Sequence, residues 1–322
     1  MNDEKPIAIF GVKRKSLELR RESQSGGAFS VIAEHFLRNG AIVYGCGFND
    51  NLDVVYIRVD NIDDLKKIKG SKYVRAYLHD TFERVLQDLR NGRTVLFSGS
   101  ACNIAGLKKL AYTVLGKEKA QKLYTVDFIC HGTPSQEIYK EYCDFIEKKY
   151  KKKISAFDFR KRFEGGWGIH MENIKFSDGT EIDSRVYTDL FYSNFVLRPT
   201  CAECRYTSWT RSSDFTVADF WGVEKYHPEF YDKEGVSLLF CNTNRSLEIF
   251  EQISGEIDIV SSNRQECKQP NLSRSSIFPK HRKAFWKYLH KNGFEAALKR
   301  YTNYGGKVVE IKRKILRRLG QW

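Results

Sequence analysis

Hydrophobic positions in the first half of the chain alternate between strand-like runs and helix-like spacing. Residues 28–38 place Phe29, Ile32 and Phe36 on one helical face, and this segment ends near Asn39-Gly40. Between such segments lie short apolar runs that predict strands, at residues 7–12, 41–48, 54–60, 94–97 and 123–129. This alternation predicts an α/β fold with a mainly parallel or mixed sheet flanked by helices.

The second half of the chain has a different pattern. Residues 171–176 and 180–183 flank Ser177-Asp178-Gly179, which predicts a hairpin. Thr133 and Pro134 predict a helix start, because threonine caps helices and proline suits the first helical position. We expect three parts, which are an α/β domain (1–150), an α+β part with a Cys-x-x-Cys pair (151–260) and a helical region with a basic tail (261–322).

The charge balance favours an acidic partner. The 322 residues include 54 Lys and Arg against 40 Asp and Glu, a net charge of +14. This excess suits nucleic acid, a phosphorylated ligand, an anionic membrane or an acidic protein. Part of the excess is local, at residues 148–153 and 307–318, and a solvated face is the alternative explanation of such a run. The tail mixes apolar and basic residues, so it is either an amphipathic helix on a membrane surface or a terminal helix packed on the body.

The N-terminal sequence does not have the pattern of a signal peptide, and no apolar run approaches the roughly 20 residues of a membrane span. We therefore expect a cytoplasmic protein. In such a chain, cysteines favour metal binding or catalysis over disulfides.

Four of the eight cysteines suggest a metal site. Cys201-x-x-Cys204 allows two sulfurs to face one ion or cluster, as in zinc, dithiol and iron–sulfur sites. Cys102 and Cys130 follow two predicted strands, and loops after the carboxyl ends of parallel strands share one edge. Four thiolates suit either a cubane cluster or zinc, and both interpretations stay open. Structural thiols are predicted for the other four, Cys46, Cys143, Cys241 and Cys267.

Three glycine-bearing turns suggest phosphate or cofactor contacts, and an ordinary tight turn is the alternative for each. They are Ser25-Gly26-Gly27, Gly70-Ser71-Lys72-Tyr73 and Gly99-Ser100. Glycine lets backbone amides approach a ligand, and a helix start favours an anion. His131 is either a proton donor or a structural histidine. Asp219-Phe220-Trp221-Gly222 either lines a pocket for a flat ring or packs in the core.

Taken together, these motifs resemble the coenzyme F-420 hydrogenase/dehydrogenase beta-subunit family. The resemblance covers residues 8–245 and rests on the segments 25–30, 70–74, 99–103, 127–132, 201–206 and 213–222. It implies FAD near a [4Fe-4S] cluster, with Cys102, Cys130, Cys201 and Cys204 as the cluster ligands. The flavin or substrate contacts would then come from Ser25, Gly26, Gly27, Lys72, Tyr73, Gly99 and Ser100, with Lys72 on an anionic group and His131 as proton donor.

The resemblance also implies an activity, namely electron transfer between the cluster, FAD and a small, anionic organic substrate. Short bacterial members are found among polysaccharide-biosynthesis proteins. No cysteine precedes Cys46, so we expect no ferredoxin-like segment of the kind that many relatives carry. Electrons would then come from a separate ferredoxin, a flavin reductant or a partner subunit. The family's Gly-Thr-Pro-Cys-Gln reads Gly99-Ser100-Ala101-Cys102-Asn103 here, which alters the predicted flavin loop.

The competing hypothesis is a zinc-containing module that binds nucleic acid or protein. It predicts steeply salt-dependent binding. The sequence contains no recognisable nucleic-acid motif, which argues against nucleic acid as the partner.

Overall fold

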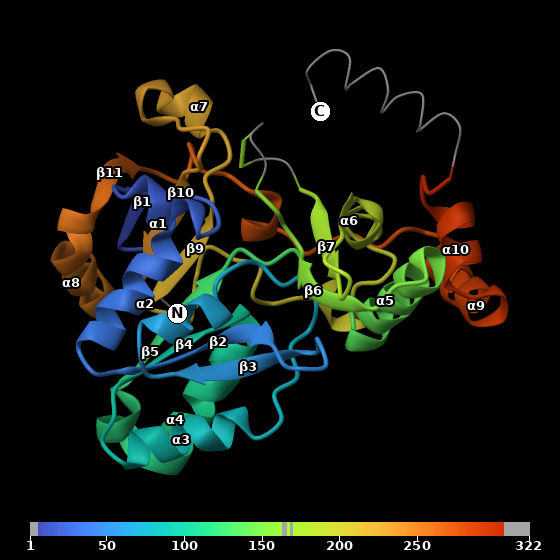
Figure 1. The fold of residues 1–322 in the computed structure, drawn as a ribbon. Helices are drawn as coiled ribbons and strands as arrows, with labels where there is room; N and C mark the ends of the chain where they lie inside the picture. The colour runs from blue at the N-terminus through green and yellow to red at the C-terminus, as the bar shows by residue number, and fades with distance from the viewer. Residues whose placement is uncertain (1–5, 163–165, 168–169, 306–322) are drawn as a thin grey trace. The chain divides into compact units, whose positions relative to one another are not determined.

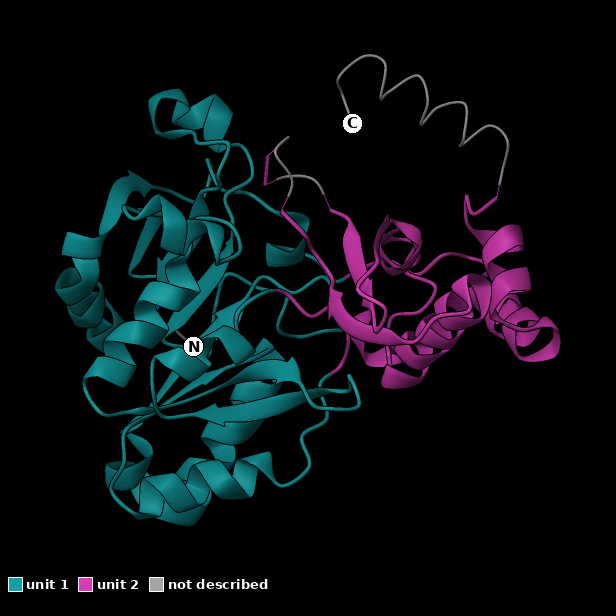
Figure 2. Ribbon diagram, viewed as in Figure 1, with its two compact units in different colours: residues 1–70, 76–131, 204–275 teal, residues 71–75, 132–203, 276–322 magenta. Residues whose placement is uncertain are grey.

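The chain forms two compact units (Figure 2). The computed structural model describes residues 6–162, 166–167 and 170–305. Unit 1 comprises residues 1–70, 76–131 and 204–275, and unit 2 comprises residues 71–75, 132–203 and 276–322. Both units draw on sequence from all three parts expected above.

Unit 1 is built on an eight-stranded mixed sheet with the order β11-β1-β10-β9-β5-β4-β2-β3 (Figure 1). Strands β2, β4, β5 and β9 run parallel, and the remaining pairs are antiparallel. The fold is therefore α/β, as predicted. The strands are β1 (Ala8–Arg14), β2 (Ile42–Phe48), β3 (Val54–Val59), β4 (Val95–Ser98), β5 (Leu123–Phe128), β9 (Phe215–Asp219), β10 (Ser237–Cys241) and β11 (Ile257–Ser262).

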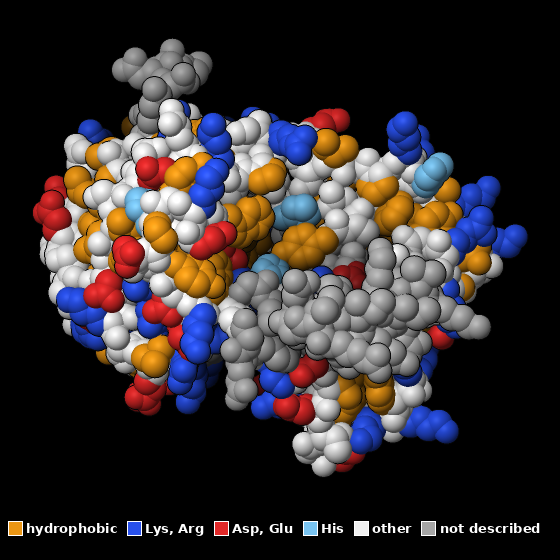
Figure 3. Space-filling view, turned by 90° about the horizontal axis from the view of Figure 1, so that it is seen from above, with side chains coloured by type: hydrophobic (Ala, Val, Ile, Leu, Met, Phe, Trp, Pro, Cys, Tyr) orange, Lys and Arg blue, Asp and Glu red, His pale blue; other side chains and the backbone are white. Residues whose placement is uncertain are grey.

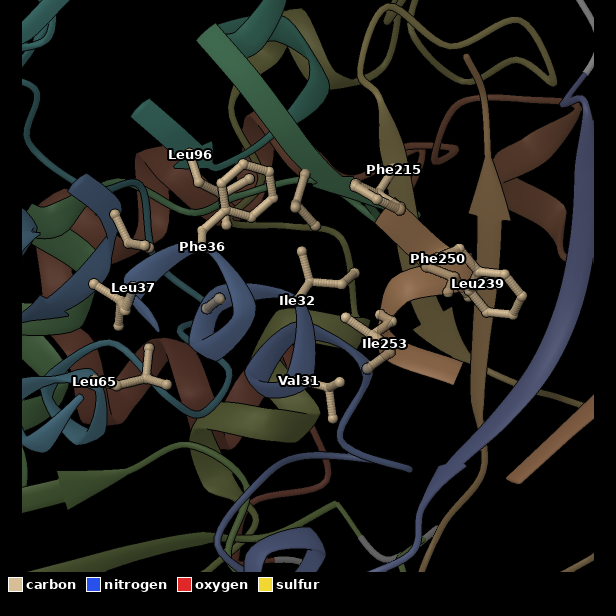
Figure 4. Packing of buried hydrophobic residues seen from close by; sticks show 14 of the residues in the cluster. Val31, Ile32, Phe36, Leu37, Leu65, Leu96, Phe215, Leu239, Phe250 and Ile253 are labelled. Carbon is tan, nitrogen blue, oxygen red and sulfur yellow. The ribbon is translucent and has the colours of Figure 1, made fainter. Parts of the chain in front are cut away.

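Helices cover both faces of this sheet. Helices α2 (Ala28–Arg38) and α8 (Asn244–Ile253) bury their apolar faces on one side, where Ile32 and Phe36 pack in one core with Leu96 (Figure 4). Successive strand residues point to opposite faces. Phe97 accordingly packs on the other side, edge-on against Phe82 of α3 (Thr81–Arg90) at 6.0 Å. The other helices of unit 1 are α1 (Leu17–Arg21), α4 (Ala101–Ala120) and α7 (Val223–Tyr226), with 3-10 turns η1 (Asp63–Lys67), η3 (Pro228–Phe230), η4 (Ser254–Glu256) and η5 (Pro270–Leu272).

Unit 2 combines a three-stranded antiparallel sheet with helices. The β7–β8 hairpin confirms the prediction, since Gly179 has φ 84° and the Thr180 amide donates to Asp178. The helical C-terminal prediction is confirmed over residues 282–301. The elements are α5 (Gln136–Tyr150), β6 (Ile154–Asp158), β7 (Glu172–Phe176), β8 (Glu181–Ser184), α6 (Val186–Tyr192), η2 (Pro199–Cys201), α9 (Arg282–Asn292) and α10 (Phe294–Tyr301).

The predicted start of α5 is wrong. The helix begins at Gln136 after an extended Ser135, rather than at Thr133 and Pro134. Pro134 instead forms an antiparallel bridge with Leu197, so its backbone belongs to a strand-like pairing. A tertiary contact has overridden the local helix-start signal.

A buried carboxylate organises unit 2. Glu172 of β7 accepts hydrogen bonds from the amides of Tyr187 (2.9 Å) and Thr188 (3.2 Å), in the first turn of α6. The hydroxyls of Thr188 (2.6 Å) and Tyr142 (3.0 Å) donate to it as well. Burial raises the pKa of Glu172. The side chain therefore ties the sheet to the positive end of α6.

The surface charges are mixed rather than segregated on the face shown in Figure 3, where basic side chains lie among acidic and apolar ones. In the lysine run 148–153, Lys152 pairs with Asp178 (2.8 Å) and Lys153 with Glu147 (2.6 Å). Among the described helices, none combines the length and apolar character needed to cross a bilayer. The basic tail 307–318 lies outside the described residues.

Candidate functional site

The parallel strands of unit 1 bring two of the predicted cysteines to the same sheet edge. Strands β4 and β5 are parallel neighbours, with Ser98 opposite Val126. Cys102 lies in the first turn of α4, directly after β4, and Cys130 lies two residues beyond the end of β5. Cys102 is exposed and Cys130 is half-buried. This edge, at the carboxyl ends of parallel strands, is where open α/β sheets bind ligands.

The loop that begins at Cys204 is fixed to the same strand end by a buried ion pair. Arg211 donates through Nε (3.1 Å) and Nη2 (2.7 Å) to one carboxylate oxygen of Asp127 in β5. It also donates to the carbonyl of Phe128 (3.2 Å). Its Nη1 donates to the carbonyls of Tyr206 (2.9 Å) and Ser208 (3.3 Å), within the loop itself. Arg211 therefore clamps the Cys204 loop to the strand that precedes Cys130.

Asp214 provides a second anchor at the far end of this loop. Its side chain is fully buried and receives the guanidinium of Arg245 from α8, with two contacts of 2.7 Å. The amide and hydroxyl of Thr125 in β5 also donate to it, each at 2.9 Å. In addition, Lys108 of α4 donates to the Ser212 carbonyl at 2.6 Å. The loop is thus fastened at both ends to the sheet and its helices.

The four predicted cluster ligands divide between the units. Cys102, Cys130 and Cys204 belong to unit 1, and Cys201 belongs to unit 2, where a β-carbon added at Gly132 would lie 3.3 Å from that of Cys201. Within the described ranges, no three or more His, Cys, Asp or Glu side chains are gathered so that they could hold a metal ion. The four-cysteine site stays a prediction.

The Ser25-Gly26-Gly27 turn is buried and internally bonded. The amide of Gly26 donates to Ser237 Oγ at 2.8 Å, and the amide of Gly27 donates to the Gln24 carbonyl at 3.2 Å. A β-carbon at Gly26 would overlap the Val12 carbonyl oxygen and lie 2.6 Å from the Ser237 nitrogen. Close packing between β1 and β10 therefore accounts for this glycine without a ligand.

The Gly99-Ser100 turn lies at the ligand edge. Gly99 leaves room for Tyr56, whose hydroxyl would lie 2.7 Å from an added β-carbon and accepts from Asn103 Nδ2 at 2.8 Å. Ser100 is the N-cap of α4, and its hydroxyl lies 3.2 Å from Cys102 Sγ. Like the Ser25-Gly26-Gly27 turn before α2, this turn leads directly into a helix start, which suits an anionic group.

The remaining predicted contacts lie at unit boundaries along the chain. Lys72 and Tyr73 belong to unit 2, where the Tyr73 ring packs 4.9 Å from that of Phe191 and its carbonyl accepts from Tyr187 Oη at 3.0 Å. His131 is half-buried and is the last residue of its unit 1 segment. Their roles toward a ligand stay predictions.

The Arg211–Asp127 clamp was not among the features predicted from the sequence. An aspartate inside the apolar strand 123–129 was the available signal, because a buried charge requires a partner. Arg211 lies in a polar stretch with no periodicity, so nothing local marks it as that partner. By contrast, burial raises the pKa of Cys143, Cys241 and Cys267 to about 12, as expected of inert structural thiols.

Comparison with known proteins gives a family and a fold. Residues 92–265 match the family profile that describes the C terminus of the coenzyme F420 hydrogenase/dehydrogenase beta subunit. A chain from the xenon-derivatised F420-reducing [NiFe] hydrogenase complex of Methanosarcina barkeri is similar in fold, with a TM-score of 0.57 and 16% identity. That similarity covers 97% of this chain and 94% of the other. No curated protein matched.

Proposed function

Because the chain belongs to the coenzyme F420 hydrogenase/dehydrogenase beta-subunit family, we propose that it passes electrons between a [4Fe-4S] cluster, FAD and a small organic substrate. Family membership itself makes the chain an oxidoreductase of the hydrogenase/dehydrogenase beta-subunit type. The cofactors, the substrate and a role in polysaccharide biosynthesis are parts of the proposal.

One observation carries the proposal. Cys102 and Cys130 follow adjacent parallel strands at the ligand edge of unit 1, and a buried ion pair fastens the Cys204 loop to the second of these strands. All four predicted ligands lie within residues 92–265, the region that matches the family. Only Cys201 belongs to the other unit, three residues from Cys204.

The bound groups would convert between one-electron and two-electron transfer, because a cluster carries single electrons and a flavin carries one or two. The protein's own contribution is positioning. The start of α4 at Ser100 offers backbone amides to an anionic group. Lys72 would bind an anionic part of the substrate or cofactor, and His131 would hold a proton for the substrate.

Electrons would enter from a separate ferredoxin or a partner subunit. The similar chain in the Methanosarcina barkeri structure comes from a multi-subunit hydrogenase complex, which supports partner subunits as a general arrangement. The proposed location is the cytoplasm.

The deciding experiment is anaerobic purification followed by iron, sulfide, zinc and flavin analysis. We expect brown protein with about four iron and four sulfide per chain and releasable FAD. Cys102→Ser should lower the iron and sulfide content, whereas Cys143→Ser should leave both unchanged because Cys143 is a helix residue with a strongly raised thiol pKa. Colourless protein with stoichiometric zinc would contradict the proposal and favour the zinc-module alternative.

The basic tail adds a separate proposal about membrane contact. Residues 307–318 combine apolar and basic side chains, a composition that suits an anionic membrane surface. Full-length protein should float with vesicles containing phosphatidylglycerol, and a chain lacking residues 305–322 should not. Equal flotation of the two chains would refute a role for the tail.

A further inference from the structure

Unit 1 contains a pocket that none of the predicted cofactor ligands lines. Its volume is about 510 Å³, within the range of small-molecule sites. Two stretches of chain far apart in the sequence form it, the Cys204 loop and the segment that follows β11. The lining residues are Trp209, Arg264, Lys268, Gln269, Pro270 and Ser273.

The walls of this pocket rest on a packed core. The Trp209 ring stacks on Phe240 of β10, with centroids 5.7 Å apart and planes at 22°. In the segment that follows β11, Cys267 and Leu272 are buried in the hydrophobic cluster against which Trp209 also packs. The side-chain amide of Gln269 donates to the Asp219 carbonyl at 2.7 Å, which fastens this wall to the end of β9. The pocket is therefore shaped before any ligand arrives.

The pocket is electropositive. The Arg264 guanidinium lies 4.9 Å from the Trp209 ring centroid, a cation–π contact that holds it at the wall. Neither Arg264 nor Lys268 forms an ion pair with any described residue. The neighbouring acid, Glu266, is engaged by His227 and Ser262, each at 2.9 Å. Two cations without acidic partners among the described residues thus face a cavity that also has an aromatic wall.

We propose that this pocket binds an organic anion that has a flat, apolar body and a phosphate or carboxylate head. Arg264 and Lys268 supply charge-assisted hydrogen bonds to the head, and Ser273 supplies a hydroxyl. Pro270 and the Trp209–Arg264 stack provide the flat surface for the body. The site is independent of the proposed redox function, since it shares no residue with the predicted flavin or cluster contacts.

The test is calorimetric titration of the full-length protein with two probe anions, phenyl phosphate and benzoate. Benzyl alcohol lacks the anionic head and inorganic phosphate lacks the flat body, so these two compounds measure the binding of each part alone. We expect at least one probe anion to bind tenfold more tightly than both of these, and the better probe identifies the head group. Failure of both anions to bind more tightly than benzyl alcohol and inorganic phosphate would overturn the proposal.

Substitutions of the lining residues test whether the probe binds in this pocket. Arg264→Gln and Lys268→Gln should each weaken binding of the better probe about tenfold, the usual effect of losing one charge-assisted hydrogen bond. The matched control is Arg300→Gln in unit 2, because Arg300 lies 4.6 Å from the Tyr288 ring centroid in a similar cation–π contact. It should bind as the native chain does. Lys268 is exposed, so its variant tests the site even where Arg264→Gln disturbs folding. Unchanged affinity in Lys268→Gln would refute its role, and the proposed head-group contact with it.

Discussion

Replacing Arg211 with alanine should destabilise unit 1 more than any single change to a surface charge. The side chain is 2% exposed and its partner Asp127 is fully buried, with 2.7 Å between Nη2 and the carboxylate. Arg211→Ala removes the guanidinium and leaves this carboxylate buried without its cation. It also removes the donors that reach the carbonyls of Tyr206, Ser208 and Phe128.

Breaking a buried pair by deleting one partner costs about 3–5 kcal/mol. That is a large part of the roughly 5–15 kcal/mol that keeps a domain folded. Most of the cost comes from the uncompensated charge rather than from the lost contacts. Combining Arg211→Met with Asp127→Asn removes that charge, so the double variant should be more stable than Arg211→Ala.

Urea unfolding followed by circular dichroism measures the free-energy differences. The matched control is Arg84→Ala, also in unit 1, whose exposed pair with Asp80 (3.2 Å) should contribute about 0.5 kcal/mol or less. A local readout is iodoacetamide labelling of Cys204 in metal-free protein, with exposed Cys102 as the internal reference. Labelling of Cys204 should accelerate in Arg211→Ala. If Arg211→Ala and Arg84→Ala unfold at the same urea concentration, the reasoning about the buried charge is wrong.

Two further predictions concern packing and pH. Gly26→Ala should destabilise the protein by about 1–3 kcal/mol in urea unfolding, because the new β-carbon meets backbone atoms of Val12 and Ser237, whereas Gly255→Ala has open space and should change little. Equal effects of the two alanines would contradict the packing account. Burial raises the pKa of Glu172 above its ordinary 4.5. The protonated side chain therefore makes its full contribution to the unfolding free energy below pH 4.5, and this contribution is lost as the pH rises through the raised pKa. Unfolding free energies measured across that range should therefore fall less steeply with pH in Glu172→Gln than in the native chain, and parallel curves would show that Glu172 does not titrate as inferred.

Local patterns were sufficient for the elements of the sheet because each strand and helix carries its own signal. The apolar runs at β4 and β5 and the helical spacing of α2 are contained within a few residues, and the structure follows them. The start of α5 was mispredicted because the pairing of Pro134 with Leu197 joins residues 63 positions apart. Local sequence propensity cannot predict a contact between residues so far apart in the chain.

The candidate site was only partly predictable for the same reason. Strand order placed Cys102 and Cys130 at one edge, since that follows from parallel neighbours. The Arg211–Asp127 clamp and the pocket at Trp209 and Arg264 depend on tertiary packing between distant segments. Nothing in the local sequence of Arg211 or Arg264 distinguishes them from solvated surface arginines.

The interleaving of the two units limits how the chain can be divided. The chain passes between them at 70/71, 75/76, 131/132, 203/204 and 275/276. A fragment ending near residue 150 would contain β1 without β10 and β11, and β5 without β9. Such a fragment would expose unpaired strand edges, which are templates for aggregation. Expression trials should therefore keep the whole chain, and gene fusions should be made at its ends rather than at an internal boundary.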